Sequence, residues 1–303
     1  MESVRIFFSD DYLTDAVEPG MRSTFDVMRG CRVREALLAS RRATRRDFHA
    51  PEPISDEMLR LVHTDAYLAS LNDPAVVARL LLLDPRGPWD ERLLRPFLVA
   101  AGGTLAAARF AAIHDAIGFN LGGGFHHAQA DKGEGFCPIA DVAIAIRALR
   151  REGMCGRVLI IDLDYHHGNG NAEIFATDES VFTFSLHANN WCWIDKRNHL
   201  DVELPAGTAD ASYLAEVERH VPSILDRFRP DFVAYVAGAD PFCEDMLGDF
   251  AVSEQGMLVR DRLVTTAVRE RGLPLLVVTA GGYGPTSWRI VHQYLDWLLR
   301  DHG

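Results

Sequence analysis

The sequence predicts an α/β protein with one mostly parallel central sheet and helices on both of its faces. Short apolar runs, several of them β-branched, alternate along the chain with helical segments of ten or more residues. Parallel neighbouring strands need a long crossover connection, usually a helix, so this alternation favours a parallel sheet. Continuous apolar runs are typical of strands buried on both faces. We find no linker, repeat or low-complexity segment, and therefore predict a single domain, 1–303.

Length and composition fit a globular protein and disfavour binding to nucleic acid. The chain has 303 residues, of which 48% are hydrophobic and 24% are charged. Its formal net charge is -12, and an acidic chain lacks the basic footprint that phosphate binding requires. We expect no nucleic-acid partner, whereas histones or other basic peptides remain possible.

Cysteine usage and the missing targeting signals bear on location. The five cysteines are an odd number at irregular spacing without a Cys-x-x-Cys pair, so we expect reduced thiols and a cytoplasmic protein. The stretch from Met1 to Asp11 is too short and too acidic for a signal peptide. No apolar run approaches the length needed to span a bilayer, so we predict no membrane partner.

The first half of the chain combines strand-like runs with several helices. Ser55 is followed by two acids, which suits a helix N-terminus, and Pro138 and Gly153 suit the first turn and the end of another helix. The expected strands are 4–8 and 117–121, and the expected helices are 33–40, one from Ser55, one from His63 to Asp65 onward, 99–116 and 138–152. Residues 84–90 are rich in Asp, Pro and Gly, which predicts a surface loop or a lid.

The second half alternates strands and helices regularly. The expected strands are 158–161, 181–186, 200–204, 232–236 and 275–279. The expected helices run from Asp210 or Ser212 to Phe228, from 253 to 271 and from 286 to 299. The candidate functional residues follow the ends of most of these strands.

Charged residues follow the strand at 158–161 in the order Asp162-Leu-Asp-Tyr-His166. Alternate residues of an extended chain point to the same side, so Asp162, Asp164 and His166 converge where the strand stops. Buried charge is unfavourable without a partner, and a divalent cation would pair with this group. From this motif alone, half of a metal site and a strand end that caps the next helix are both open.

Two adjacent histidines follow a glycine run after the strand at 117–121. The glycines Gly122 to Gly124 permit close backbone approach and unusual dihedral angles, which predicts a loop that positions His126 and His127. Tandem histidines also occur on ordinary polar surfaces, so this pair by itself leaves both interpretations open.

These polar groups fall at the carboxyl ends of different predicted strands, the edge where parallel sheets bind ligands. The strand-end residues are His126, His127, Asp162, Asp164, His166, Ser185, Asp240 and Tyr283. Asp240 is the natural third metal ligand, because Gly238 lets the backbone approach closely. Two carboxylates and one imidazole leave an ion coordinatively open; they suit zinc and also admit iron or manganese.

An open metal ion of this kind supports hydrolysis, because it lowers the pKa of bound water and polarises a carbonyl group. A neutral histidine can take the proton from that water, and a tyrosine hydroxyl can stabilise the oxyanion. His127 and Tyr283 are placed for these two roles. We therefore expect amide hydrolysis.

At this point the chain resembles the zinc-dependent histone deacetylases. The matching stretches, in family order, are Gly122-Gly-Gly-Phe-His-His127, Gly135-Phe-Cys137, Asp162-Leu-Asp-Tyr-His-His-Gly-Asn-Gly170, Ser185-Leu-His187, Ala237-Gly-Ala-Asp240 and Gly281-Gly-Tyr283. Several matches in register are far more specific than any single motif. Residues 230–260 and 277–283 look most like class IV enzymes, and bacterial deacetylase-like amidohydrolases are equally similar.

The resemblance implies the arginase/deacetylase fold, one zinc ion per chain and a set of site residues. The implied zinc ligands are Asp164, His166 and Asp240, and the implied catalytic residues are His126 with its supporting Asp162, His127 and the carbonyl-polarising Tyr283. A structural potassium site is implied at Asp162, Asp164, His166, Ser185 and Leu186. The implied wall of the narrow tunnel for an acyl-lysine chain contains Gly135, Phe136 and Leu247.

Two features depart from the family pattern. Asn169 stands where many class I enzymes have a second Asp, as in class II and class IV members, so His127 should hold a proton less readily. The loop after Ser185-Leu-His187 contains Trp191 and Trp193, and the sequence leaves open which of them, if either, lines the pocket. Cys243 is expected to be a buried structural thiol.

The leading hypothesis is a zinc-dependent amidohydrolase that removes an acetyl or longer acyl group from lysine side chains or related amines. An acetylpolyamine amidohydrolase is the second, since an acidic entrance suits a cationic polyamine. A dinuclear manganese ureohydrolase ranks low, because it expects Asp-x-His-x-Asp where this chain reads Asp-x-Asp-x-His. A catalytically inactive protein that binds acylated ligands is disfavoured by the presence of Tyr283 and both histidines. The expected partners are acylated lysine in peptides or proteins, or acylated small amines.

Overall fold

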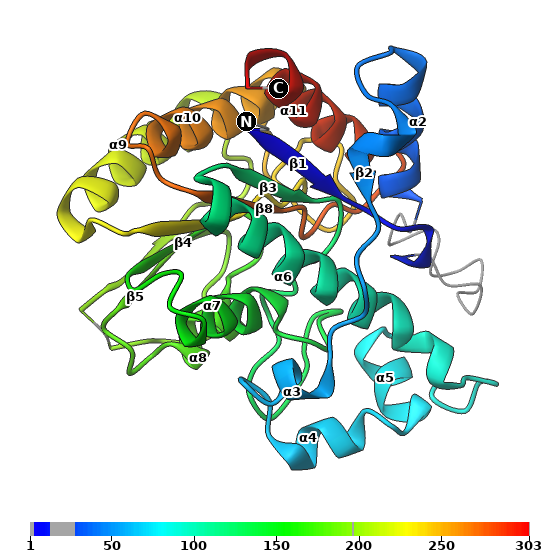
Figure 1. Cartoon of the computed structure of the whole chain (residues 1–303). Coiled ribbons are helices and arrows are strands. Elements are labelled where there is room, and N and C mark those ends of the chain that lie inside the picture. Colours follow the sequence, from blue (N-terminus) through cyan, green and yellow to red (C-terminus); the bar gives the residue numbers. More distant parts are fainter. Residues whose placement is uncertain (1–2, 13–27, 196, 303) are drawn as a thin grey trace.

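A computed structural model of the chain describes residues 3–12, 28–195 and 197–302. The strands in this part of the chain are β1 (Val4–Phe7), β2 (Phe48–His49), β3 (Ile117–Asn120), β4 (Val158–Asp162), β5 (Val181–His187), β6 (His199–Glu203), β7 (Phe232–Val236) and β8 (Leu275–Val278). They form one sheet in the order β2-β1-β3-β8-β7-β4-β5-β6, in which every neighbouring pair is parallel (Figure 1). The predicted α/β class with a mostly parallel sheet is confirmed.

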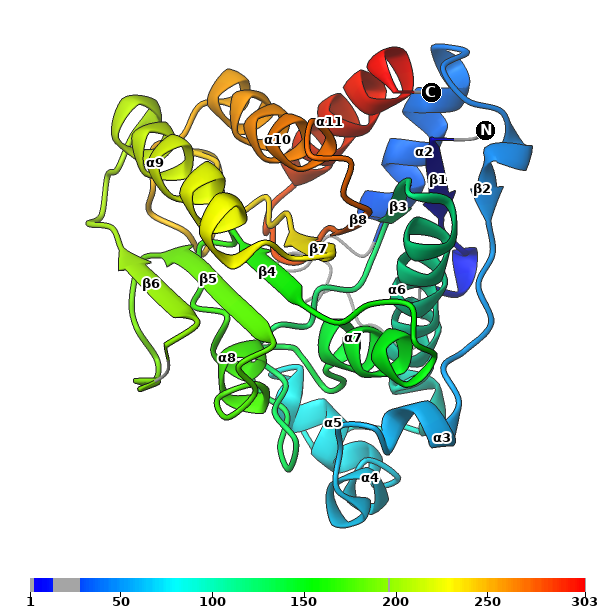
Figure 2. The same ribbon diagram turned by 60° about the vertical axis from the view of Figure 1, so that its left-hand side comes forward.

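Helices cover both faces of the sheet (Figure 2). The helices of the described part are α2 (Arg29–Ala39), α3 (Asp56–Leu59), α4 (Asp65–Ser70), α5 (Pro74–Leu80), α6 (Arg95–His114), α7 (Asp141–Arg151), α8 (Asn169–Ile174), α9 (Asp210–Phe228), α10 (Glu254–Arg269) and α11 (Ser287–Asp301). α9, α10 and α11 lie on one face, with α2 packed beside α11, and α6 and α7 pack together on the other.

The central strands are buried on both sides, which explains their continuous apolar sequences. In β4, Leu159 and Ile161 belong to the hydrophobic cluster under α9 and α10. Val158 and Ile160, which alternate with them, belong to the cluster under α6 and α7. A polar residue in the middle of this strand would therefore lose its hydration whichever face it pointed to.

The differences between predicted and observed elements concern short segments. β2, α5 and α8 have two, seven and six residues, too few for a clear periodic pattern, and were not predicted. The helix expected at Ser55 is a single turn, although the Ser55 hydroxyl does accept a hydrogen bond from the Met58 amide. Asp210 does not cap α9 with its side chain; its carboxylate accepts hydrogen bonds from the amide and hydroxyl of Ser253, at 2.7 and 2.6 Å, and so ties α9 to α10.

One expectation about apolar runs is wrong. The segment Glu91–His114 is long and apolar enough to cross a membrane by length and composition. Most of it is α6, which packs against α7, β3 and β8, and most of its apolar window is buried inside the protein. Its apolar residues are therefore accounted for by the core.

Candidate active site

The carboxyl ends of five neighbouring strands lie at the same level of the sheet. Asn120 of β3 pairs with Val278 of β8, Val278 pairs with Val236 of β7, and Asp162 of β4 pairs with both Val236 and Ser185 of β5. The segments that follow these ends gather around one centre, and they carry His126, His127, Asp164, His166, Asp240 and Tyr283. The predicted convergence at this edge is therefore present in the structure.

Asp164, His166 and Asp240 form a compact group of potential metal ligands. The Nδ1 atom of His166 lies 2.9 Å from Asp240 Oδ2 and 3.2 Å from Asp164 Oδ1, and one ligand atom of each residue lies within 4.8 Å of the others. Both carboxylates are fully buried. Burial, together with the charge of Asp164, raises the pKa of Asp240 to about 7. A divalent cation would remove this conflict, so the donor set fits a metal ion.

The backbone around these carboxylates is arranged to hold them. The Gly281 amide donates to Asp164 Oδ2 at 2.8 Å, and the Tyr165 amide donates to Asp240 Oδ1 at 2.8 Å. A Cβ atom at position 281 would lie 2.3 Å from Asp240 Oδ2, so only glycine fits there. One oxygen of each carboxylate is thereby oriented by a peptide group.

A buried arginine supports the same loops and was not predicted. Arg260 of α10 donates from Nη1 to the carbonyl oxygens of Gly238, at 2.7 Å, and Leu163, at 3.1 Å. Its charge is balanced by Asp261, whose Oδ1 lies 2.7 Å from Arg260 Nη2. The sequence contains no motif that marks this pair, because its role depends on the position of α10 beside two strand ends.

The two histidines are held through their Nδ1 atoms by different partners. His126 Nδ1 lies 2.9 Å from Asp162 Oδ2, and His127 Nδ1 lies 2.6 Å from Asn169 Oδ1. Asn169 Nδ2 donates to Glu134 Oε2 at 3.2 Å, which fixes the orientation of the Asn169 amide. Because the amide oxygen faces His127, Nδ1 of this ring carries a proton and Nε2 keeps its lone pair.

The surroundings of the two histidines raise the pKa of His126 and lower the pKa of His127. Burial alone would lower the pKa of His126, but the carboxylates of Asp162 and Asp164 outweigh it and raise the pKa to about 9. Burial and the charge of His126 lower the pKa of His127 well below its usual value. His126 is thus suited to carry positive charge and His127 to act as a neutral base.

Tyr283 stands across the centre from the histidines. Its ring centroid lies 5.9 Å from that of His166, with the rings nearly perpendicular. Its backbone is fixed by Asp245, whose Oδ2 accepts from the Tyr283 amide at 2.6 Å, and by the Met246 amide, which donates to the Tyr283 carbonyl at 2.9 Å. Burial, together with Asp164 and Asp240, raises the pKa of Tyr283 well above its usual value, so its hydroxyl stays a proton donor.

The residues predicted for a potassium site are neighbours in the structure. Asp162 and Ser185 are partners across β4 and β5, and the Asp164 amide donates to Asp162 Oδ1 at 3.2 Å. The Ser185 hydroxyl hydrogen-bonds His187 Nδ1 at 2.7 Å. Potassium binding by this group, with His166 and Leu186, stays a prediction.

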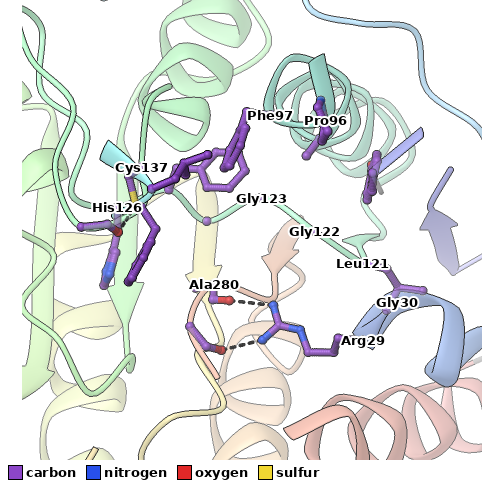
Figure 3. A pocket seen from close by; sticks show the side chains of 18 of the residues that line it. Arg29, Gly30, Pro96, Phe97, Leu121, Gly122, Gly123, His126, Cys137 and Ala280 are labelled. Carbon is purple, nitrogen blue, oxygen red and sulfur yellow. Dashed lines mark hydrogen bonds between the residues drawn. The ribbon is translucent and has the colours of Figure 1, made fainter. Parts of the chain in front are cut away.

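A cavity of about 100 Å³ is lined in part by His126 and Tyr283. Figure 3 shows this cavity from close by. Its wall is largely apolar and includes Phe97 and Phe136, with Gly135 beside them. Arg29 of α2 closes another side and donates to the carbonyl oxygens of Ala280, at 2.6 Å, and Gly281, at 2.7 Å. Gly135 and Phe136 line this cavity, and their role in a tunnel for an acyl-lysine chain stays a prediction.

Of Leu247, Trp191 and Trp193, only Trp191 contacts a residue of the site, His127. Leu247 is exposed on the loop held by Asp245 and is not among the residues that line this cavity. The Trp191 indole lies parallel to the His127 imidazole, with ring centroids 4.1 Å apart, whereas Trp193 is 88% exposed. Trp191 is therefore the tryptophan that contacts the site. Cys243 is exposed, so the expectation of a buried thiol was wrong.

Comparison with known proteins gives a consistent result. The family model for the histone deacetylase domain matches residues 24–296. Histone deacetylase 2 of Arabidopsis thaliana is 31% identical over 99% of this chain and 80% of its own length. A crystal structure of a histone deacetylase homologue complexed with SAHA has a TM-score of 0.79 at 25% identity, covering 97% of this chain and 84% of that one.

The acetylpolyamine aminohydrolase from Burkholderia pseudomallei shares the fold, with a TM-score of 0.77 at 22% identity over 97% of this chain and 98% of that one. The family match extends over most of the sequence, and the sheet and its helices agree with the arginase/deacetylase fold that the motifs implied. The chain belongs to the histone deacetylase family of hydrolases.

Proposed function

We propose that the protein is a zinc-dependent hydrolase that removes an acyl group from a lysine side chain or a related amine. The observation that carries this proposal is the juxtaposition of Asp164, His166 and Asp240 with a neutral histidine and a buried tyrosine hydroxyl. The names of the relatives support deacetylation, and a crystallised homologue is complexed with SAHA.

Different residues of the site would bind the metal ion and transfer the proton. Asp164, His166 and Asp240 would hold the metal ion, which when bound supplies a Lewis acid for water and for the amide carbonyl. His127 accepts a proton from the attacking water through Nε2 and returns it to the departing amine.

The remaining groups stabilise developing charge. The Tyr283 hydroxyl donates a hydrogen bond to the carbonyl oxygen as that oxygen becomes negative. His126, held protonated beside Asp162, adds positive charge on the side opposite Tyr283, and Asn169 keeps His127 in the tautomer that leaves Nε2 free.

The cavity beside the centre supports acyl chains longer than acetyl. It is enclosed by apolar side chains and by Gly135 and Phe136, and it adjoins His126 and Tyr283, where the acyl carbonyl would react. A longer chain would bury more apolar surface in this space than an acetyl group does.

The test is hydrolysis of lysine peptides that carry acetyl, butyryl, octanoyl or myristoyl groups. Purified protein is assayed as it is, after removal of metal by a chelator, and after zinc is restored. We expect turnover that the chelator abolishes and zinc recovers, with the preferred chain length reporting the size of the cavity. Equal turnover with and without metal, or none on any acylated amine, would contradict the proposal.

A second candidate, hydrolysis of acetylated polyamines, is favoured by one observation. Glu134 precedes the tunnel-wall residue Gly135, and its side chain is 40% exposed beside Asn169, where a cationic amine could approach it. Turnover of an acetylated polyamine in the absence of turnover on acyl-lysine peptides would select this activity. We also retain as proposals a single catalytic domain, a structural potassium ion and a cytoplasmic location.

A further inference from the structure

A second group of histidines and carboxylate lies next to the active site and has no part in the chemistry above. His167, His187, His199 and Asp201 come from the segment after β4 and from β5 and β6. His167 and His187 are fully buried, with ring centroids 4.3 Å apart, and the side chain of Asp201 is 11% exposed. Three of these residues, His167, His187 and Asp201, are close enough to hold a metal ion by distance alone.

The contacts of this second cluster indicate which ring nitrogens carry protons. The Trp191 amide donates to His167 Nδ1 at 3.0 Å, so the proton of this ring is on Nε2, which lies 3.2 Å from Asp201 Oδ2 without the alignment of a hydrogen bond. His187 Nε2 lies 2.7 Å from Asn190 Oδ1, an acceptor, and therefore also carries a proton. In the absence of a metal ion, both imidazoles therefore present N–H groups to neighbouring acceptors of the protein.

Asp201 places a carboxylate oxygen next to the Nε2 atoms of His167 and His199. Its Oδ2 lies 2.7 Å from His199 Nε2 and 3.2 Å from His167 Nε2, and it lies on the far side of the His167 ring from Trp191. Thr183 hydrogen-bonds the other nitrogen of His199 at 2.7 Å, and a carboxylate oxygen against Nε2 makes His199 a donor to Asp201. A carboxylate can accept from both rings, whereas a donor at this position would oppose them.

The chain of contacts ends at the active site. His167 binds the backbone of Trp191, and the Trp191 indole stacks on His127 and meets His166 edge-on, with centroids 6.2 Å apart. The indole is 43% exposed, so it covers His127 on one side and is open to a substrate on the other. No helix or strand holds this residue, since positions 188–195 have neither in the described structure.

We propose that Asp201 is a positioning residue for the substrate tunnel: it fixes the His167 tautomer whose Nδ1 accepts the Trp191 amide, and so holds the Trp191 indole against His127. In the other tautomer, His167 would present an N–H group to the Trp191 N–H group, and the loop would be released. The role in substrate binding rests on the proposed function, but the coupling between Asp201 and Trp191 does not.

The experiment measures two quantities on Asp201→Ala. Amide hydrogen exchange of the peptide that contains Trp191 reports the backbone hydrogen bond directly, without substrate. KM and kcat for the acyl-lysine peptide that is hydrolysed fastest show whether displacement of Trp191 weakens substrate binding. We expect exchange at the Trp191 amide to be at least about tenfold faster, and KM to rise several-fold with kcat changed less than about twofold.

Controls separate this role from a general loss of packing. Thr183→Val removes a hydrogen bond from the same cluster but not one on the path to Trp191, so its exchange and KM should stay near those of the unaltered protein. His167→Asn places an amide oxygen that can accept the Trp191 N–H without a tautomer choice, so Asp201→Ala should have little effect in that background. In Trp191→Ala, Asp201→Ala should add no further change in KM.

The outcomes are decisive in each case. If Asp201→Ala leaves Trp191 exchange no faster than in Thr183→Val, the proposal is wrong. If Asp201→Ala does not fold, Asp201→Asn, which keeps the shape but adds a donor, is measured against the same two criteria. If no acyl-lysine peptide is hydrolysed by the unaltered protein, the proposed function fails, and the exchange measurement alone supports or contradicts the coupling.

Discussion

Two clusters built from the same residue types contain the neighbouring residues His166 and His167 and differ in how many carboxylates they hold. In the first, two buried carboxylates share a single imidazole, so negative charge is in excess. In the second, a single carboxylate lies 3.2 Å from His167 Nε2 and 2.7 Å from His199 Nε2, so less negative charge is gathered there. Distance alone makes both clusters candidates for a metal ion. The two fully buried carboxylates of the first cluster make it the better site for a cation.

The largest expected effect comes from removing a ligand of the first cluster. Asp240→Asn should lower bound zinc to a small fraction of one ion per chain and reduce hydrolysis by at least about a hundredfold, because an amide binds zinc poorly. Elemental analysis and turnover are measured on the same preparation. Asp201→Asn is the matched control in the second cluster and should keep its metal. Loss of zinc in the control but not in Asp240→Asn would reverse the assignment.

Tyr283→Phe tests whether the site beside the first cluster is catalytic. The substitution removes the hydroxyl that donates to the carbonyl oxygen, so kcat should fall about a hundredfold while bound zinc is unchanged. Because the phenyl ring still fills the space beside His166, the fold should be retained. Turnover within a few-fold of the unaltered enzyme would remove Tyr283 from the mechanism.

Asn169→Asp changes the charge next to the base without changing its shape. Burial and the charge of His126 lower the pKa of His127, and a carboxylate at position 169 would oppose this shift by favouring the imidazolium form. A protonated His127 cannot accept a proton, so the acid limb of kcat/KM should move to higher pH by about one unit. If the acid limb of the kcat/KM profile does not move, a group other than His127 determines its position.

The second cluster predicts a smaller effect, on stability. Burial and the nearby His167 lower the pKa of His187 to about 4, from 6.5. The unfolded chain therefore binds more protons between these values, and the free energy of unfolding should fall as the pH drops from 6.5 to 4, by about 3 kcal/mol at most from this residue. In His187→Gln, the free energy of unfolding measured with denaturant should depend less steeply on pH between 6.5 and 4. An equal slope would mean that His187 does not contribute.

Strand positions and the first cluster could be read from the sequence because their signals are local. The run 158–161 is apolar because both faces of β4 are buried, and the acids after it mark the carboxyl end of the sheet. Glycine beside Asp240 also indicated close backbone approach, and a Cβ atom at Gly238 would lie 2.3 Å from Asp164 Oδ2.

The remaining features depend on contacts between distant segments. Arg260 and Arg29 reach carbonyl oxygens of loops that are adjacent only in the fold. The stacking of Trp191 on His127 depends on a loop anchored by His167, and nothing in the sequence of that loop distinguishes Trp191 from Trp193. Cys243 was misjudged for the same reason, since the exposure of a loop residue is set by what packs over it.

The most direct test of the contrast between the clusters is a crystal structure of zinc-loaded protein with anomalous diffraction measured on both sides of the zinc absorption edge. We predict one zinc peak, between Asp164, His166 and Asp240, and none among His167, His187 and Asp201. A peak in the second cluster, or none in the first at full zinc loading, would contradict the assignment.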